Sequence, residues 1–362
     1  MKPHWVDSHT AVQRLCAALE TAGPVGLDTE FVRERTYRPQ LALLQCQTGE
    51  QTWLVDVTAG TDFSPLAYWL GGAGLKVFHS CREDLEVLTQ TLAPVRPPVW
   101  DTQLAHAFLG GPLQLSYQKL VQHHTGVVLE KGETRSDWLR RPLSPAQRRY
   151  AAEDVIWLPC IQSEQAEQLA TLGRRDWFDE DMDQLLAEAS REPDSSRLHL
   201  GSRAALDMDE ASLRRYRDLL YWREQTARQR NLPRGFVLKN DVLHRLALQP
   251  PGSLAELESL PLHPAFVRRH GEGLLALLQG EGPYALEAPP APPLPPLNRP
   301  EDKQALARLR QHIAECAGDL RIEPTLIGTR KDMEHYLRWQ QGLLREPGRL
   351  GQGWRAQVLD LE

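Results

Sequence analysis

The chain of 362 residues has few cysteines and no long apolar run. Its five cysteines are scattered and form no Cys-x-x-Cys pair, which argues against a disulfide framework and against a cysteine zinc site. Apolar stretches fall short of the roughly 20 residues that cross a bilayer, and the N-terminus lacks the apolar core of a signal peptide. A net charge of −6 excludes a globally basic nucleic-acid coat. We therefore expect a soluble cytoplasmic protein of two or three domains with no membrane partner.

Two acids stand at the end of an apolar segment, residues 25–31. Asp28 and Glu30 are separated by one residue, so in a β-strand both carboxylates project from the same face. Adjacent anions repel each other and resist burial, and a divalent cation is the usual compensation. A strand that ends in a solvated acidic turn explains this pair equally well, so the choice between them depends on further carboxylates.

The first half of the chain alternates strand-like and helix-like segments. Helices are expected at residues 8–19, 65–70 and 83–92. Strands are expected at residues 25–31, 41–48, 52–57, 75–80 and 99–102, with a hairpin turn at 49–51. Three antiparallel strands followed by strand–helix units predict the α/β class, with a mixed sheet flanked by helices.

From about residue 203 the strand signals stop and helical patterns continue. Residues 191–196 are polar and rich in turn formers, which indicates a linker. Residues 289–300 hold seven prolines in twelve positions, which favours a semi-rigid spacer over a ligand for a proline-binding module. The expected organisation is a domain at residues 1–192, a linker at 193–206, a helical domain at 207–283, a Pro-rich linker at 284–300 and a C-terminal helical domain at 301–362.

A helix with two polar side chains on one face is expected after residue 144. Ser144, Pro145 and Gln147 together predict its first turn. Tyr150 and Asp154 follow at spacing i, i+4 and share one face. A phenol and a carboxylate one turn apart can hold a water between them and a metal, whereas a core tyrosine beside a surface aspartate is the simpler reading of the pair alone.

A further acid follows the expected strand at residues 75–80. Asp84 lies at the strand end where α/β sheets usually place ligands. It also suits the first turn of a helix, where an acid interacts favourably with the helix dipole. Glu83 and Glu86 compete with it, and spacing alone does not select among the three.

Taken together, three segments resemble the DEDD superfamily of 3′→5′ exonucleases. They are residues 28–31, residues 79–85 and residues 150–155, where the Tyr-x-x-x-Asp form marks the tyrosine branch. Residues 136–143 are similar to a segment of the ribonuclease D family. The resemblance covers residues 24–160 and implies a ribonuclease H-like exonuclease domain. One departure is Ser80, where many members have Asn.

The resemblance implies a hydrolytic site with two metal ions. Asp28, Glu30, Asp84 and Asp154 would coordinate two divalent ions, Mg²⁺ or Mn²⁺, which prefer oxygen ligands. Tyr150 would orient the attacking water, because a phenol with a pKa near 10 is a poor base at neutral pH. These five residues are the expected catalytic set, and nucleoside 5′-monophosphates are the expected products.

Residues 207–282 resemble the HRDC helical domain that helicases and ribonuclease D share, and residues 301–362 resemble a diverged second copy. The segment from Arg214 to Lys239 contains eight basic and only two acidic residues, with aromatic residues among them. Basic side chains neutralise phosphates and exposed rings stack on bases, although an amphipathic helix with a solvated basic face explains the pattern too. The expected nucleic-acid contacts are Thr29, Phe31, His79, Arg214, Arg215, Arg223, Arg228 and Arg230.

The leading hypothesis is a metal-dependent exoribonuclease that trims RNA 3′ ends, notably those of tRNA precursors, without an obligate protein partner. A DNA exonuclease of the same branch is the alternative enzyme, because discrimination between the sugars depends on contacts to the 2′-hydroxyl. A catalytically silent RNA-binding or scaffold protein is the alternative from another class. The four acids and the tyrosine argue against it, because such a cluster is costly without a metal.

Overall fold

The chain folds into two compact units that are interleaved along the sequence. The computed structural model describes residues 2–130, 132–133 and 136–361. Unit 1 consists of Met1–Val32, Pro39–Arg191 and Leu297–Glu362, and unit 2 of Arg33–Arg38 and Glu192–Pro296. Each unit is built around its own hydrophobic core.

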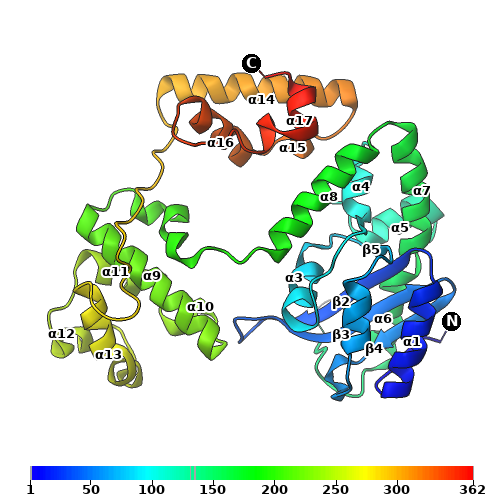
Figure 1. The fold of residues 1–362 in the computed structure, drawn as a ribbon, viewed down its shortest axis with the longest axis horizontal. Helices are drawn as coiled ribbons and strands as arrows, with labels where there is room; N and C mark the ends of the chain where they lie inside the picture. Colours follow the sequence, from blue (N-terminus) through cyan, green and yellow to red (C-terminus); the bar gives the residue numbers. More distant parts are fainter. Residues whose placement is uncertain (1, 131, 134–135, 362) are drawn as a thin grey trace. The chain divides into compact units, whose positions relative to one another are not determined.

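Within the described residues, a six-stranded mixed sheet forms the centre of unit 1 (Figure 1). The strands are β1 (His4–Val6), β2 (Val25–Val32), β3 (Gln40–Thr48), β4 (Gln51–Val55), β5 (Lys76–Phe78) and β6 (Val99–Asp101), in the spatial order β1-β4-β3-β2-β5-β6. Antiparallel pairing joins β2 to β3 and β3 to β4, whereas β5 runs parallel to both β2 and β6. The predicted α/β class and mixed sheet are confirmed. The short edge strand β1, parallel to β4, is an addition to the prediction.

Helices flank this sheet. They are α1 (His9–Thr21), α2 (Ser64–Leu70), α3 (Arg82–Thr91), α4 (Thr102–Phe108), α5 (Tyr117–Thr125), α6 (Pro145–Ile156), α7 (Leu158–Thr171) and α8 (Arg175–Ser190). Of these, α1, α2, α3 and α6 correspond to predicted segments. The predicted start of α6 is confirmed as a capping box. The Gln147 amide N–H donates to Ser144 Oγ at 3.1 Å, and the Ser144 N–H donates to Gln147 Oε1 at 2.9 Å. This cap fixes the beginning of the helix that carries Tyr150 and Asp154.

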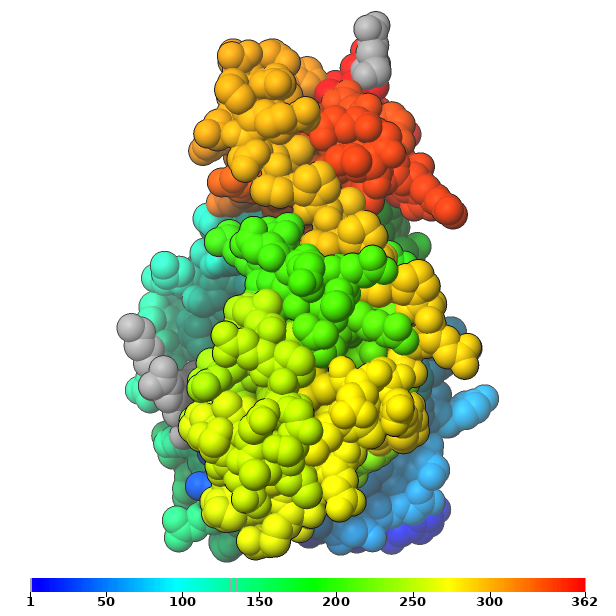
Figure 2. Space-filling view, turned by 90° about the vertical axis from the view of Figure 1, so that its left-hand side faces the viewer, coloured from blue at the N-terminus to red at the C-terminus, as the bar shows by residue number. Residues whose placement is uncertain are grey.

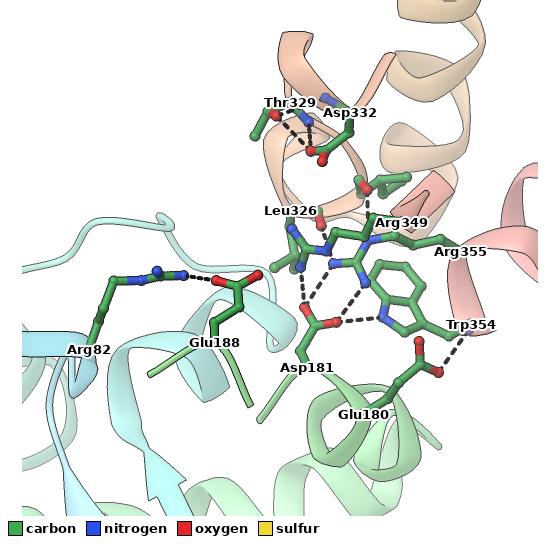
Figure 3. Close-up of polar contacts among 11 residues, drawn as sticks. Arg82, Glu180, Asp181, Glu188, Leu326, Thr329, Asp332, Arg349, Trp354 and Arg355 are labelled. Atoms are coloured by element: carbon green, nitrogen blue, oxygen red, sulfur yellow. Dashed lines mark hydrogen bonds and ion pairs between the residues drawn. The ribbon is translucent and has the colours of Figure 1, made fainter. Parts of the chain in front are cut away.

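The C-terminal helices complete the core of unit 1. They are α14 (Pro300–Leu320), α15 (Pro324–Ile327), α16 (Arg330–Gln340) and α17 (Gly353–Leu359). Asp181 of α8 accepts two hydrogen bonds from Arg355, at 2.6 and 2.7 Å, and one from Arg349 at 2.6 Å (Figure 3). Trp354 stacks on Trp177 with ring centroids 4.9 Å apart. Residues 301–362, expected from the sequence as a separate domain, share one hydrophobic core with the sheet.

Unit 2 is helical, as predicted. Its helices are α9 (Glu210–Arg230), α10 (Arg234–Val237), α11 (Asn240–Leu248), α12 (Leu254–Glu258) and α13 (Pro264–Leu278), whose surface is green to yellow in Figure 2. The loop Arg33–Arg38 joins this unit through Tyr37, whose hydroxyl donates to Glu224 Oε1 at 2.5 Å. Over the described parts of both units, no helix has the length and apolar character needed to cross a membrane.

Candidate active site

Strand β2 supplies two of the predicted acids. Asp28 pairs with Gln45 across the sheet and Glu30 with Leu43, and the register shifts just after Glu30. Side chains two residues apart on a strand share a face. Among the described residues, the carboxylate oxygens of Asp28, Glu30 and Asp154 lie within 4.8 Å of one another. Folding therefore brings β2 and α6 together at three of the four predicted acids.

A glycine permits this close approach. Gly26 precedes Asp28 by two residues and shares its face of β2. A Cβ at this position would lie 2.7 Å from the carbonyl oxygen of Val155 and 3.0 Å from Cβ of Leu158. Because Val155 directly follows Asp154, the backbone contact at Gly26 also sets the position of Asp154. Sequence reasoning missed this role, since a glycine inside a strand equally marks a bulge or a bend.

Asp84 is the fourth acid, held in the first turn of α3. Oγ1 of Thr29 donates to Oδ1 of Asp84 at 2.5 Å. Asp84 is buried, whereas Glu83 is exposed and Glu86 is half-buried. Burial beside β2 thus separates Asp84 from the two competing acids, which spacing along the sequence does not.

The turn between β5 and α3 has an unusual backbone. Ser80 adopts a φ of 63°, in the left-handed region that costs most L-residues about 1–2 kcal/mol and that Asn tolerates better. The amides of Ser80 and Cys81 donate to the Asp101 carboxylate at 3.0 and 2.8 Å, which holds the turn in place. The position where the DEDD pattern favours Asn is therefore one where Asn suits the backbone.

Tyr150 packs against the segment 136–143. The rings of Trp138 and Tyr150 lie 6.0 Å apart, and a Cβ on Gly132 would come within 2.1 Å of Cδ2 of Tyr150. Arg141 fastens the segment to the sheet through two hydrogen bonds to Asp56, each 2.7 Å long. Sequence reasoning picked out this segment by resemblance but missed its function, which is to hold the tyrosine in place.

Burial raises the pKa of every acid in the cluster, and repulsion by other cluster acids raises it further at Asp28 and Glu30. The pKa of Glu30 rises to about 9, first through burial and then through the charges of Asp154 and Asp84. Burial is also the main reason why the pKa values of Asp84 and Asp154 rise to about 7. The pKa of Asp28 lies well above its usual range for the same reasons. A cation among these groups would relieve the repulsion.

Gln45 is a neighbour of the cluster that sequence reasoning missed. It lies directly opposite Asp28 and is fully buried. Within the described part of the chain, neither polar atom of its side-chain amide has a hydrogen-bond partner. Side chains of directly opposed residues share a face, so this amide lies on the same face as the acids. The pairing that places Gln45 opposite Asp28 is the one between β2 and β3, which no local sequence pattern sets.

Three of the predicted nucleic-acid contacts are internal. Thr29 is buried and bonded to Asp84. The ring nitrogens of His79 lie 3.0 Å from a hydroxyl of α4 and 2.9 Å from a backbone carbonyl. Arg223 is buried and donates to groups of its own unit at 3.0 and 2.7 Å. Their polar atoms are therefore engaged within the protein, and contact of these three side chains with RNA stays a prediction.

The other five predicted contacts differ in exposure. Arg214 and Arg230 are exposed on α9. Arg215 and Arg228 are half-buried, with Nε of Arg215 donating to a carbonyl at 2.7 Å and Nε of Arg228 to the Tyr37 hydroxyl at 3.0 Å. Phe31 is half-buried at the end of β2. For these five residues, contact with RNA remains a prediction.

The mixed sheet, the acids on β2, α3 and α6, and the tyrosine one turn before Asp154 define a 3′→5′ exonuclease. The 3′-5′ exonuclease family matches residues 3–169, and the HRDC domain family matches residues 212–278.

Full-length relatives define the family further. Ribonuclease D of Xanthomonas oryzae pv. oryzae is 37% identical over 99% of this chain and 97% of its own length. Ribonuclease D of Escherichia coli is 32% identical over 99% of this chain and 96% of its own. The crystal structure of the E. coli enzyme superposes with a TM-score of 0.91, at 31% identity, over 99% of this chain and 97% of that one. The chain belongs to the ribonuclease D family and is an exoribonuclease.

Proposed function

We propose that the enzyme removes nucleotides from the 3′ ends of structured RNAs, including tRNA precursors, and releases nucleoside 5′-monophosphates. The observation that carries this proposal is the cluster of one buried and three half-buried carboxylates with raised pKa values on β2, α3 and α6. Burial makes it unfavourable to keep four neighbouring acids charged, and bound divalent cations would offset that free-energy cost. The relative from E. coli, described as an exoribonuclease involved in structured RNA processing, supports the substrate class.

The residues present suit hard divalent cations. All four acids offer only oxygen ligands, which favours Mg²⁺ or Mn²⁺ over softer metals. We assign two such ions to Asp28, Glu30, Asp84 and Asp154. When bound, ions of this class lower the pKa of water and stabilise the charge that develops on both oxygens of a phosphoryl displacement.

Tyr150 acts by positioning rather than by taking a proton. Its pKa is raised above the usual value, first by burial and then by the charge of Asp154. The phenol therefore stays protonated at neutral pH and can donate a hydrogen bond to the attacking water. Trp138 and Gly132 hold the ring, which fixes the direction of that hydrogen bond.

The basic surface of α9 supports contact with RNA outside the catalytic centre. Arg214 and Arg230 are exposed and available to phosphates. Lys239, just after α10, is exposed as well. Contacts of this kind attract RNA of any sequence and weaken as salt concentration rises, which suits an enzyme that accepts several structured RNAs.

The test is mononucleotide release from a 3′-tailed RNA and from a DNA of the same sequence. Asp28→Asn should abolish hydrolysis without unfolding the protein, and Asp84→Asn should do the same. The matched control is Glu83→Gln, one residue from Asp84 but exposed, which should keep full activity. Full activity of Asp28→Asn would refute the metal assignment. Faster release from DNA than from RNA would favour the DNA exonuclease.

A further inference from the structure

A second group of metal-ligating side chains lies away from the carboxylates, on α4 and α5. Among the described residues, His106, His123 and His124 each place a ring nitrogen within 4.8 Å of the others. They come from the last turns of the two helices. Backbone carbonyls at helix C-termini carry partial negative charge, which favours a cation at this position.

One imidazole in this group has an unused buried nitrogen. The side chain of His124 is only 3% exposed, and its Nδ1 lies 2.8 Å from Oε2 of Glu164 on α7. Within the part of the chain that the structure describes, the buried Nε2 of His124 has no hydrogen-bond partner. A histidine whose one nitrogen faces a carboxylate while the other is free has the arrangement of a metal ligand with its outer partner.

The spacing of the rings suits a tetrahedral ion. Three imidazoles around one Zn²⁺, at Zn–N distances of about 2.1 Å, place their ring centroids roughly 5 Å apart. The centroids of His106 and His123 are 5.2 Å apart, those of His123 and His124 are 5.0 Å apart, and those of His106 and His124 are 6.1 Å apart. A small rotation of one side chain would complete the geometry.

A glycine leaves room for the ring of His106. A Cβ on Gly111 would lie 2.1 Å from Nε2 of His106.

A cavity of about 460 Å³ opens beside the group. His106 and His123 line it, together with Lys119 and Gln168. It is large enough for water, so an ion held by three histidines would keep an open position toward this cavity.

We propose that His106, His123 and His124 bind one Zn²⁺ ion, with a water in the cavity as the fourth ligand. Nitrogen ligands select a borderline metal such as zinc, whereas the all-oxygen cluster on β2, α3 and α6 selects Mg²⁺ or Mn²⁺. The two sites therefore differ in residues, elements and metal preference.

The zinc would join α4 to α5 and thereby support the catalytic helix. Tyr117, in the first turn of α5, donates to the carbonyl of Glu153 at 3.2 Å and accepts from the amide of Trp157 at 3.3 Å. Both partners lie at the end of α6, the helix of Tyr150 and Asp154. The ion should therefore raise thermal stability, because it binds the folded state only.

The test uses full-length protein freed of metal by a chelator and carrying Asp28→Asn and Asp154→Asn, which weaken the carboxylate site. Calorimetric titration with Zn²⁺ should show one equivalent bound, and Co²⁺ should give the visible absorption bands of a four-coordinate ion. Zn²⁺ should also raise the melting temperature by a few degrees.

Three further variants distinguish a zinc site from a group of neighbouring histidines that binds no metal. His123→Ala, at an exposed position, should weaken binding at least about 100-fold, and Glu164→Gln roughly 10–100-fold. The exposed His9→Ala is the matched control and should bind like its parent. The proposal is overturned if the parent binds no zinc, or if His123→Ala binds zinc as tightly as the parent.

Discussion

Replacing Gly26 with alanine should impair catalysis by moving a helix. The new Cβ would lie 2.7 Å from the Val155 carbonyl oxygen, and ordinary van der Waals contact begins at 3.4 Å. The difference, 3.4 − 2.7 = 0.7 Å, is the shift that α6 or β2 must make. Asp154 precedes Val155, so a shift of this size reaches the carboxylate cluster directly.

The expected cost follows from the size of that shift. A displacement near 1 Å at a reacting centre lowers rates by about 100-fold, so Gly26→Ala should lower kcat by roughly 10- to 100-fold. Overpacking should also reduce the free energy of unfolding by about 1–3 kcal/mol. Single-turnover release of mononucleotides measures the first effect, and urea denaturation measures the second.

Gly23→Ala is the matched control, because a Cβ at Gly23 meets nothing within 4 Å. It should leave both activity and stability close to those of the parent. Wild-type kcat in Gly26→Ala would show that the contact between β2 and α6 does not set the position of Asp154, and the reasoning would fail.

Three further predictions concern stability. Without metal, the melting temperature should fall as the pH rises from about 4 to about 9. The pKa values of these acids are about 4 in the unfolded chain and rise to about 7 and about 9 in the folded protein, so the folded state loses stability as the acids lose their protons. Scanning fluorimetry should show a Mn²⁺-induced increase in melting temperature that grows with pH, and an increase independent of pH would contradict this. Asp181→Ala should cost about 3–5 kcal/mol in urea denaturation, because Arg355 stays buried without its partner, whereas the exposed Asp176→Ala should cost little. Ser80→Asn should stabilise the protein by roughly 0.5–1 kcal/mol, since Asn tolerates a positive φ better, and any loss of stability would count against the backbone argument.

The strands that matter for the site were predictable because their signals are local. An alternating or apolar pattern bounded by turn residues indicated β2, β3 and β4, and the hairpin between β3 and β4 was visible in residues 49–51. Strand β1, His4–Val6, was not predicted. The packing of α14 and α17 into the core of the sheet was also not predicted. The apolar face of an amphipathic helix indicates that the helix packs against another element, but it does not indicate which element.

The acids that lie together in the folded protein could be identified as a set from the sequence, while the residues that support them could not. Asp28 and Glu30 stand together in the sequence, and the motif of Tyr150 and Asp154 has its own spacing. The roles of Gly26 and Gln45 depend on contacts across the sheet that no local pattern reports. In the same way, Thr29 was expected to contact RNA because it lies within a motif, although its hydroxyl is committed to Asp84.

The interleaving of the two units constrains how this protein can be made and dissected. Unit 1 includes residues 297–362, which leave the ribosome only after the whole of unit 2 has been synthesised (Figure 1). Until these residues emerge, Asp181 of α8 lacks both of its partners, Arg349 and Arg355, and the core of unit 1 lacks its C-terminal helices. A truncation after residue 192 would keep every predicted catalytic residue and still lack part of that core. A deletion of residues 192–296, bridged by a flexible linker, would follow the unit boundaries and keep all of the C-terminal residues of unit 1.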